Sequence, residues 1–107
     1  MVTRNWTSTQ AEQALTHLPL PDVHRGRGYA EENRISGIEW TSPTVLRGAC
    51  RGSGRNRYRS TVTLVLERGR IVDTYGVCSC PVASDCKHCA ALILAAVEPE
   101  PSSSLWR

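Results

Sequence analysis

Aromatic residues are scarce in this sequence. Its 107 residues contain no phenylalanine and six other aromatic side chains, three tryptophans and three tyrosines. A chain of this length fits a single domain, but so few aromatic side chains leave it a thin hydrophobic core. Small domains of that kind commonly need a further cross-link, such as a structural metal ion. The small number of aromatic residues argues against two independent cores and favours one domain stabilised by a bound metal ion.

Long apolar segments are also missing. No run reaches the ~18 residues of a membrane-spanning helix, and the longest, Cys89 to Val97, fits a buried helix. The first ten residues lack the apolar stretch of a secretory signal. We therefore expect a cytoplasmic protein with no membrane partner, whose thiols stay reduced. Its cysteines, five in number, then indicate metal binding rather than a full set of disulfides.

Lysine is nearly absent, because twelve of the thirteen basic residues are arginine. Residues 25–70 hold ten arginines against four glutamates, although the net charge of the whole chain is only +3. A guanidinium group binds phosphate through a planar fork, so a basic surface here would suit nucleic acid. A gene of high GC content would give the same arginines without a binding role, and composition does not separate the two explanations.

Helical spacing is visible near the N-terminus. Alanines and leucines recur at helical intervals over residues 8–18, and Thr9 and Glu12 have the spacing of a capping box. A second short helix is expected around Tyr29. These segments would pack around whatever the rest of the chain forms.

The middle of the chain alternates between apolar and polar residues. Strands are predicted over residues 34–40, 44–50, 58–67 and 71–77. The third has the clearest alternation, with an inward face made of Tyr58, Val62, Leu64 and Leu66. Gly69 marks a hairpin turn before the fourth. The predicted core is therefore a short antiparallel sheet, roughly residues 44–77.

A helix follows the sheet, over about residues 86–97, with Asp85 as its N-cap. Its core-facing stripe is Cys89, Leu92, Ile93 and Ala96. The predicted fold class is α+β: a small antiparallel sheet leads into a zinc knuckle and one C-terminal helix, with short helical segments at the N-terminus.

Four metal-binding residues lie within eleven positions between the sheet and this helix. They are Cys78, Cys80, Cys86 and His88. Structural zinc sites are closed tetrahedra of such ligands. Two ligands two residues apart on a strand point the same way, whereas the same spacing on a helix splays them. We therefore expect Cys86 to lie at the helix entrance, before the backbone becomes fully helical.

Two further cysteines compete for a role in this site. Cys89 lies three residues after Cys86 and would give a four-cysteine site, but it also begins the apolar stripe of the helix, where a thiol behaves as a small hydrophobe. Cys50 is far from the others in sequence and is expected to be a core residue. The arrangement with His88 is the one we favour.

The spacing C-x-C, then C-x-H, resembles the signature of the SWIM zinc finger. The residues Cys78-Ser-Cys-Pro81 and Cys86-Lys-His88 are close to the usual sequence of that motif. The resemblance extends over about residues 27–95, through the run 48–54 and the strand 61–66. It is strongest to the SWIM module at the N-terminus of bacterial SWI/SNF-type helicases. The resemblance implies one structural zinc ion on Cys78, Cys80, Cys86 and His88, in a module for DNA or protein contacts.

Basic residues near the glycines at positions 52 and 54 are candidate nucleic-acid contacts. They are Arg47, Arg51, Arg55, Arg57 and Arg59, with Lys87 between two of the metal ligands. Such a cluster would clamp phosphates where glycine lets the backbone approach closely. An ordinary solvated hairpin would carry the same charges. Tyr58 would stack on a base or face the core, and we favour the core.

These observations predict a structural zinc-binding module that binds DNA as an accessory to a helicase. The alternative is a zinc-stabilised module that docks onto a helicase or another protein through the apolar surface of the last helix. No P-loop follows the glycines, and four ligands leave no open position for a catalytic zinc. We therefore expect no enzyme activity and no small-molecule substrate. The expected divisions are residues 1–26, an N-terminal segment; 27–98, the zinc-finger domain; and 99–107, a flexible tail.

Overall fold

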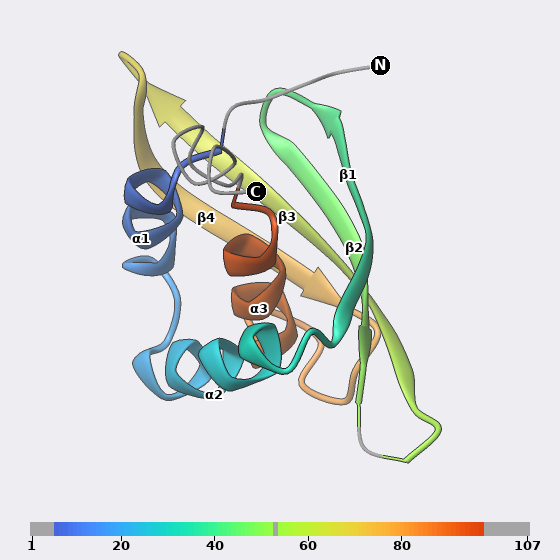
Figure 1. Cartoon of the computed structure of the whole chain (residues 1–107). Coiled ribbons are helices and arrows are strands. Elements are labelled where there is room, and N and C mark those ends of the chain that lie inside the picture. Colours follow the sequence, from blue (N-terminus) through green and yellow to red (C-terminus); the bar gives the residue numbers. More distant parts are fainter. Residues whose placement is uncertain (1–5, 53, 98–107) are drawn as a thin grey trace, which may run out of the picture.

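Three helices and a four-stranded antiparallel sheet form the part of the chain that the computed structural model describes, residues 6–52 and 54–97 (Figure 1). In chain order the elements are α1 (Ser8–Leu15), α2 (Leu20–Glu31), β1 (Ile35–Ser42), β2 (Val45–Arg51), β3 (Arg57–Glu67), β4 (Arg70–Cys78) and α3 (Lys87–Ala95). The predicted α+β class is confirmed, with a C-terminal helix after the sheet and helices before it. The predicted tail, 99–107, lies outside the described residues.

The sheet is a simple meander in which neighbouring strands are consecutive, in the order β1-β2-β3-β4. The alternation predicted for β3 is confirmed: Ser60, Val62 and Leu64 are buried, and Arg57 and Arg59 are exposed. Arg68 and Gly69 both have positive φ, 53° and 79°. Two such residues suit the tight turn that matches the twist of paired strands, so β3 returns directly as β4.

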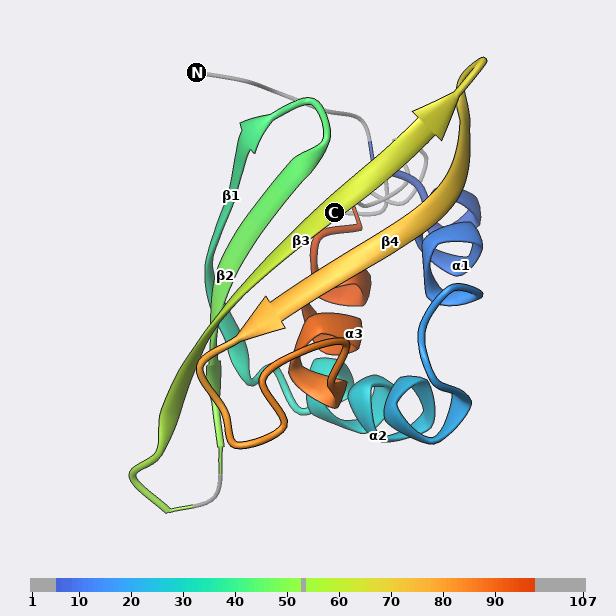
Figure 2. The ribbon, with the colours of Figure 1, turned by 180° about the vertical axis from the view of Figure 1, so that it is seen from behind.

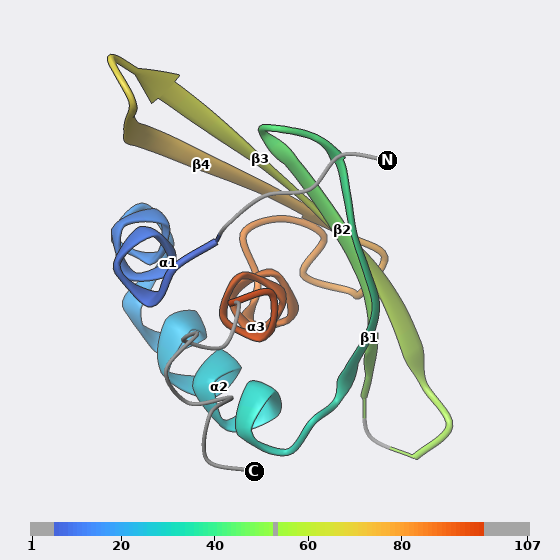
Figure 3. The same ribbon diagram turned by 45° about the horizontal axis from the view of Figure 1, so that its top comes forward.

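All three helices lie on one face of the sheet, and α3 is the innermost (Figure 3). It contacts every strand as well as α1 and α2. Fully buried apolar side chains on α3 and around it form the core; the largest are Trp6, Leu46, Leu92, Ile93 and Val62. The Trp6 indole also donates a hydrogen bond of 2.9 Å to the Ile93 carbonyl. One core thus joins the segment that precedes α1 to the last helix.

Helix α2 crosses α3 at very short range because Gly26 lies at the crossing. A Cβ at Gly26 would lie 2.7 Å from Ala90 Cβ and 2.8 Å from the Lys87 carbonyl oxygen. Both distances are shorter than side chains tolerate, so glycine allows the two backbones to approach. The close crossing covers the start of α3, where the metal-binding residues lie.

Three details differ from the sequence prediction. The capping box of α1 uses Thr7 and Gln10, not Thr9 and Glu12, because the helix starts at Ser8 and Thr7 is extended. The helix around Tyr29 is a full twelve residues, and it continues through the predicted division at residue 27. Glu12, free of the cap, instead pairs with Arg27 of α2.

The apolar surface of α3 is not open to a protein partner, contrary to the expectation above. Ala90, Leu92 and Ile93 are completely buried because α2 and α1 cover the side of α3 that faces away from the sheet. A protein partner would have to use a different surface. Within residues 6–52 and 54–97, no helix has the length and apolar character needed to cross a membrane.

Candidate metal centre

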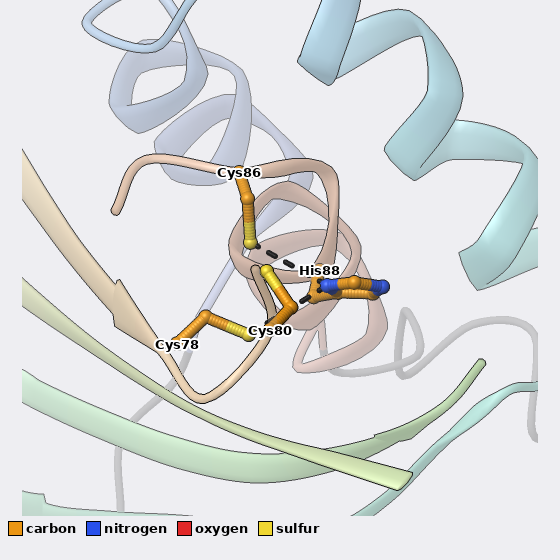
Figure 4. A group of neighbouring side chains, drawn as sticks. All are labelled: Cys78, Cys80, Cys86 and His88. Carbon is orange, nitrogen blue, oxygen red and sulfur yellow. Dashed lines mark hydrogen bonds between the residues drawn. The ribbon is translucent and has the colours of Figure 1, made fainter. Parts of the chain in front are cut away.

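Cys78, Cys80, Cys86 and His88 meet at one buried point between the end of β4 and the start of α3 (Figure 4). One ligand atom from each residue lies within 4.8 Å of those from the other three. All four side chains are buried. The predicted ligand set is therefore assembled in space, and it can hold a metal ion.

The spacing of the ligand atoms fits a tetrahedral ion. His88 Nδ1 lies 3.5 Å from the sulfur of Cys86 and 3.6 Å from that of Cys78. A zinc ion bonded at about 2.3 Å to sulfur and about 2.0–2.1 Å to nitrogen would set those edges at about 3.5 Å. The histidine faces the sulfur atoms through Nδ1, so its other ring nitrogen is directed away from them (Figure 4).

The helix entrance explains how Cys86 and His88 reach the same ion. Cys86 is the N-cap of α3, with an extended backbone at φ −93° and ψ 177°, whereas His88 lies in the first turn. The expectation that Cys86 precedes the regular helix is confirmed. The N-cap role predicted for Asp85 is wrong: its backbone has φ 47°, and its carboxylate accepts a hydrogen bond of 2.8 Å from the Gly76 amide.

Cys89 lies close to the cluster but packs against the sheet. Its sulfur is 3.9 Å from that of Cys86, and a Cβ at Gly76 would lie 2.7 Å from it. Glycine at position 76 of β4 thus leaves the space that Cys89 fills, as a core residue would. Cys50 is also buried, as predicted, in β2 and outside the cluster.

Neighbouring side chains hold two of the ligands in place. The Ser60 hydroxyl donates a hydrogen bond of 3.3 Å to the sulfur of Cys78. The ring of Tyr58 lies against that of His88, with centroids 4.7 Å apart, and Tyr29 approaches the same ring edge-on at 5.5 Å. Such outer contacts orient metal ligands and tune their basicity. The preference for Tyr58 on the inward face is confirmed.

Burial controls the protonation of the ligands. It raises the pKa of the Cys78 thiol to about 11, and a hydrogen bond with Cys89, together with burial, raises the pKa of Cys86. Burial and the nearby Lys87 lower the pKa of His88. Without a metal, the thiols of Cys78 and Cys86 are therefore protonated at neutral pH, and the imidazole of His88 is neutral. A metal must displace the thiol protons, so its affinity should rise with pH.

The five candidate arginines are separate from the metal-binding cluster, and their side chains do not enter it. Four of them, Arg47, Arg51, Arg57 and Arg59, alternate with inward residues of β2 and β3 and are exposed. They share the outer face of the sheet, on which none of α1, α2 and α3 packs (Figure 2). Arg55 is exposed in the loop between the two strands. The structure therefore places four of these residues on one open surface.

Lys87 does not belong to that surface. It is the first residue of α3, on the opposite face of the sheet, and is half-buried. Its ammonium group lies 5.3 Å from the centre of the Tyr29 ring. The six basic candidates thus divide into four arginines on the sheet face, Arg55 in the β2–β3 loop, and a single lysine beside the metal centre.

Sequence reasoning missed Tyr29 and Ser60 as neighbours of the ligands. Ser60 carried a signal, since it is a polar residue in the apolar series of Tyr58, Val62 and Leu64, and a buried hydroxyl needs a partner. Tyr29 carried none, because its position depends on the crossing of α2 over α3.

Comparison with known proteins adds no family: no protein-family model matches the chain, and neither a curated protein nor a solved structure is detectably similar to it. What can be said of its function rests on the residues and their geometry.

Proposed function

We propose that this chain is a structural zinc-binding module of the SWIM type that contacts nucleic acid. The observation that carries the zinc assignment is the buried cluster of three cysteines and one histidine. Thiolate and imidazole ligands in this ratio are typical of structural zinc. Four protein ligands complete the tetrahedron, so the ion has no open position for a substrate and the module acts by binding.

The open face of the sheet supports nucleic acid as the partner. Arg51 and Arg57 lie directly opposite each other in the β2–β3 ladder, an arrangement that costs stability unless an anion is near. A concavity of about 500 Å³ opens on the same face, with Arg47 and Arg59 among its lining residues. It lies where the β1–β2 register shifts beside Glu39. An arginine-lined hollow on a bare sheet suits a phosphate backbone.

The helicase association rests on the resemblance of the cysteine–histidine motif alone. The sequence has no P-loop lysine motif, so an ATP-driven motor would be in a linked segment or a partner. In this proposal the zinc holds the binding sheet in shape, and the motor supplies movement along the nucleic acid.

The test is nucleic-acid binding by the zinc-loaded chain, followed by fluorescence anisotropy across a salt series. Single-stranded and duplex oligonucleotides are titrated against the natural chain, an Arg47→Gln/Arg59→Gln variant and an Arg68→Gln/Arg70→Gln control. The control removes the same charge from the hairpin at the other end of β3. Loss of two phosphate contacts should lower the salt slope for a single strand by about 1.4. Equal slopes in the two variants, or no binding in low salt, would refute the nucleic-acid proposal.

A second candidate function is protein docking, favoured by apolar residues on the same outer face. Tyr75 and Val77 of β4 are 55% and 63% exposed, and they lie opposite Thr63 and Thr61 of β3. Docking through this strip should survive nuclease treatment and high salt, and Val77→Lys should abolish it. Co-purification with a helicase under those conditions would favour this alternative over nucleic-acid binding.

A further inference from the structure

A second pocket adjoins the metal centre on the helix side of the sheet. It has a volume of about 320 Å³ and lies between α2, the loop that carries Cys80, and the start of α3. Tyr29 and Tyr58 line it together with Pro81 and Val82. Its size falls at the low end of ligand-binding pockets, which measure about 300–1,000 Å³. The space suits one small, flat group.

His88 gives this pocket a hydrogen-bond donor. The residue lines the pocket and is only 4% exposed. Its Nδ1 faces the sulfur atoms, so Nε2 points away from them (Figure 4). Within residues 6–52 and 54–97, Nε2 has no hydrogen-bond partner, although the second nitrogen of a metal-bound histidine almost always donates to one. A buried donor without a protein acceptor can take its acceptor from a bound molecule.

The charges around the pocket favour a neutral ring over a free anion. Arg25 and Lys87 line it, but so does Asp22. A zinc ion with three thiolates adds a further net negative charge beside them. The two cations are therefore offset at the pocket, while they remain able to pair with a phosphate attached to the group that enters it.

We propose that this pocket binds one unstacked nucleobase of a single strand, and this rests on the proposed function. A carbonyl oxygen of the base, as in thymine, accepts the hydrogen bond from His88 Nε2. The ring lies among the lining side chains of Tyr29, Pro81 and Val82, and Lys87 or Arg25 pairs with the adjoining phosphate. Metal binding at Nδ1 places the proton on Nε2, so the zinc both shapes the pocket and fixes its donor.

The variant His88→Cys separates this role from zinc binding. It replaces one strong zinc ligand by another, so zinc content should remain one ion per chain, while the donor to the base is removed. His88→Cys also adds one thiolate charge to the cluster, so an abasic strand of equal length is the reference. Relative to that strand, binding of a short oligothymidylate should weaken about tenfold, the effect of losing one hydrogen bond of about 1.4 kcal/mol. The salt slope should stay unchanged, because the number of phosphate contacts is the same.

Nuclear magnetic resonance of the natural zinc-loaded chain gives a second readout that needs no variant. With ¹⁵N-labelled histidine, oligothymidylate should shift the Nε2–H signal of His88, and an abasic strand of equal length should not. An equal shift from the abasic strand would overturn the base assignment, as would unchanged binding by a zinc-loaded His88→Cys protein. If no strand binds the natural chain, the proposed function itself fails. Binding by oligothymidylate without a shift at His88 refutes the pocket alone.

Discussion

The two ends of α3 are held by different kinds of interaction. Around its second half, Leu92 and Ile93 are fully buried against large apolar side chains such as Trp6 and Leu46. Around its start, the buried groups are those of Cys86 and His88, with Cys78 and Cys80 opposite them. Apolar packing stabilises the second half of α3. The start of α3 instead buries polarizable sulfur atoms and a ring nitrogen, and their contribution to stability depends on a bound metal ion.

The loop that enters the helix shows the same contrast in its backbone. Ala83 and Asp85 have positive φ, 75° and 47°, a region that side chains other than glycine rarely occupy. Each such residue costs of order 1 kcal/mol or more. The hydrogen bond of 2.8 Å from the Cys78 amide to the Ala83 carbonyl helps to hold the loop. Zinc binding to small sites is worth roughly 10–16 kcal/mol, which is ample to offset this strain.

The largest effect is expected from breaking the metal end. Cys86→Ser should lower the free energy of unfolding by more than about 5 kcal/mol, which approaches the whole stability of a domain this size. Because α3 contacts every strand, the loss of structure should extend beyond the loop before α3 to at least the C-terminal half of the chain. Circular dichroism during thermal unfolding would measure it. The matched control is Cys50→Ala, also buried, which should keep one zinc and cost about 1–2 kcal/mol.

A smaller effect is expected where α2 crosses the start of α3. Gly26→Ala would place a methyl group 2.7 Å from Ala90 Cβ and should cost about 1–3 kcal/mol. Gly28→Ala, in the same helix, meets nothing within 4 Å and should stabilise the protein by about 0.5–1 kcal/mol. Urea unfolding of both variants measures the difference. Equal midpoints would show that the crossing is looser than described.

Relief of backbone strain in the loop before α3, residues 79–85, should raise stability rather than lower it. Ala83→Gly suits the positive φ of 75° and should raise the free energy of unfolding by about 0.5–1 kcal/mol, with unchanged zinc content. Differential scanning calorimetry of the zinc-loaded proteins would detect the rise. A decrease would mean that this backbone geometry is not the one adopted in solution.

The smallest expected effect lies at the surface, between α1 and α2. Arg27 binds Glu12 through two hydrogen bonds of 2.6 and 2.8 Å, and this hydrogen bonding lowers the pKa of Glu12. The carboxylate is therefore ionised, and the pair is stabilising, at neutral pH. Both side chains are largely exposed, so Glu12→Gln should cost only about 0.5 kcal/mol. Urea midpoints in low and high salt check this, because salt should abolish the difference.

Most of the fold could be predicted because its signals are local. The alternation in β3, the positive-φ turn at Gly69 and the stripe that includes Leu92 each depend on neighbouring residues. The length of α2 could not be predicted, since Gly26 and Gly28 weaken any helical signal. They are tolerated because α2 gains its stability from packing on α3. The N-cap at Thr7 was missed because two threonines offered equal spacing.

The ligand set of the metal centre could be predicted because its members are close in sequence and chemically distinctive. Its surroundings could not, since Tyr29 reaches His88 only through the crossing of two helices. The basic cluster was only partly predictable. Strand alternation places Arg47 and Arg59 on one face of the sheet. Lys87 lies between two ligands in the sequence, but it is on the other side of the sheet.

The most direct measurement of the central claim is X-ray absorption at the zinc edge of the purified chain. The account predicts one zinc per chain, with three sulfur neighbours at about 2.3 Å and one nitrogen at about 2.0–2.1 Å. Cys89→Ala should leave this spectrum unchanged, and His88→Ala should remove the nitrogen. A shell of four sulfur atoms that loses one in Cys89→Ala, or a folded chain without metal, would contradict it.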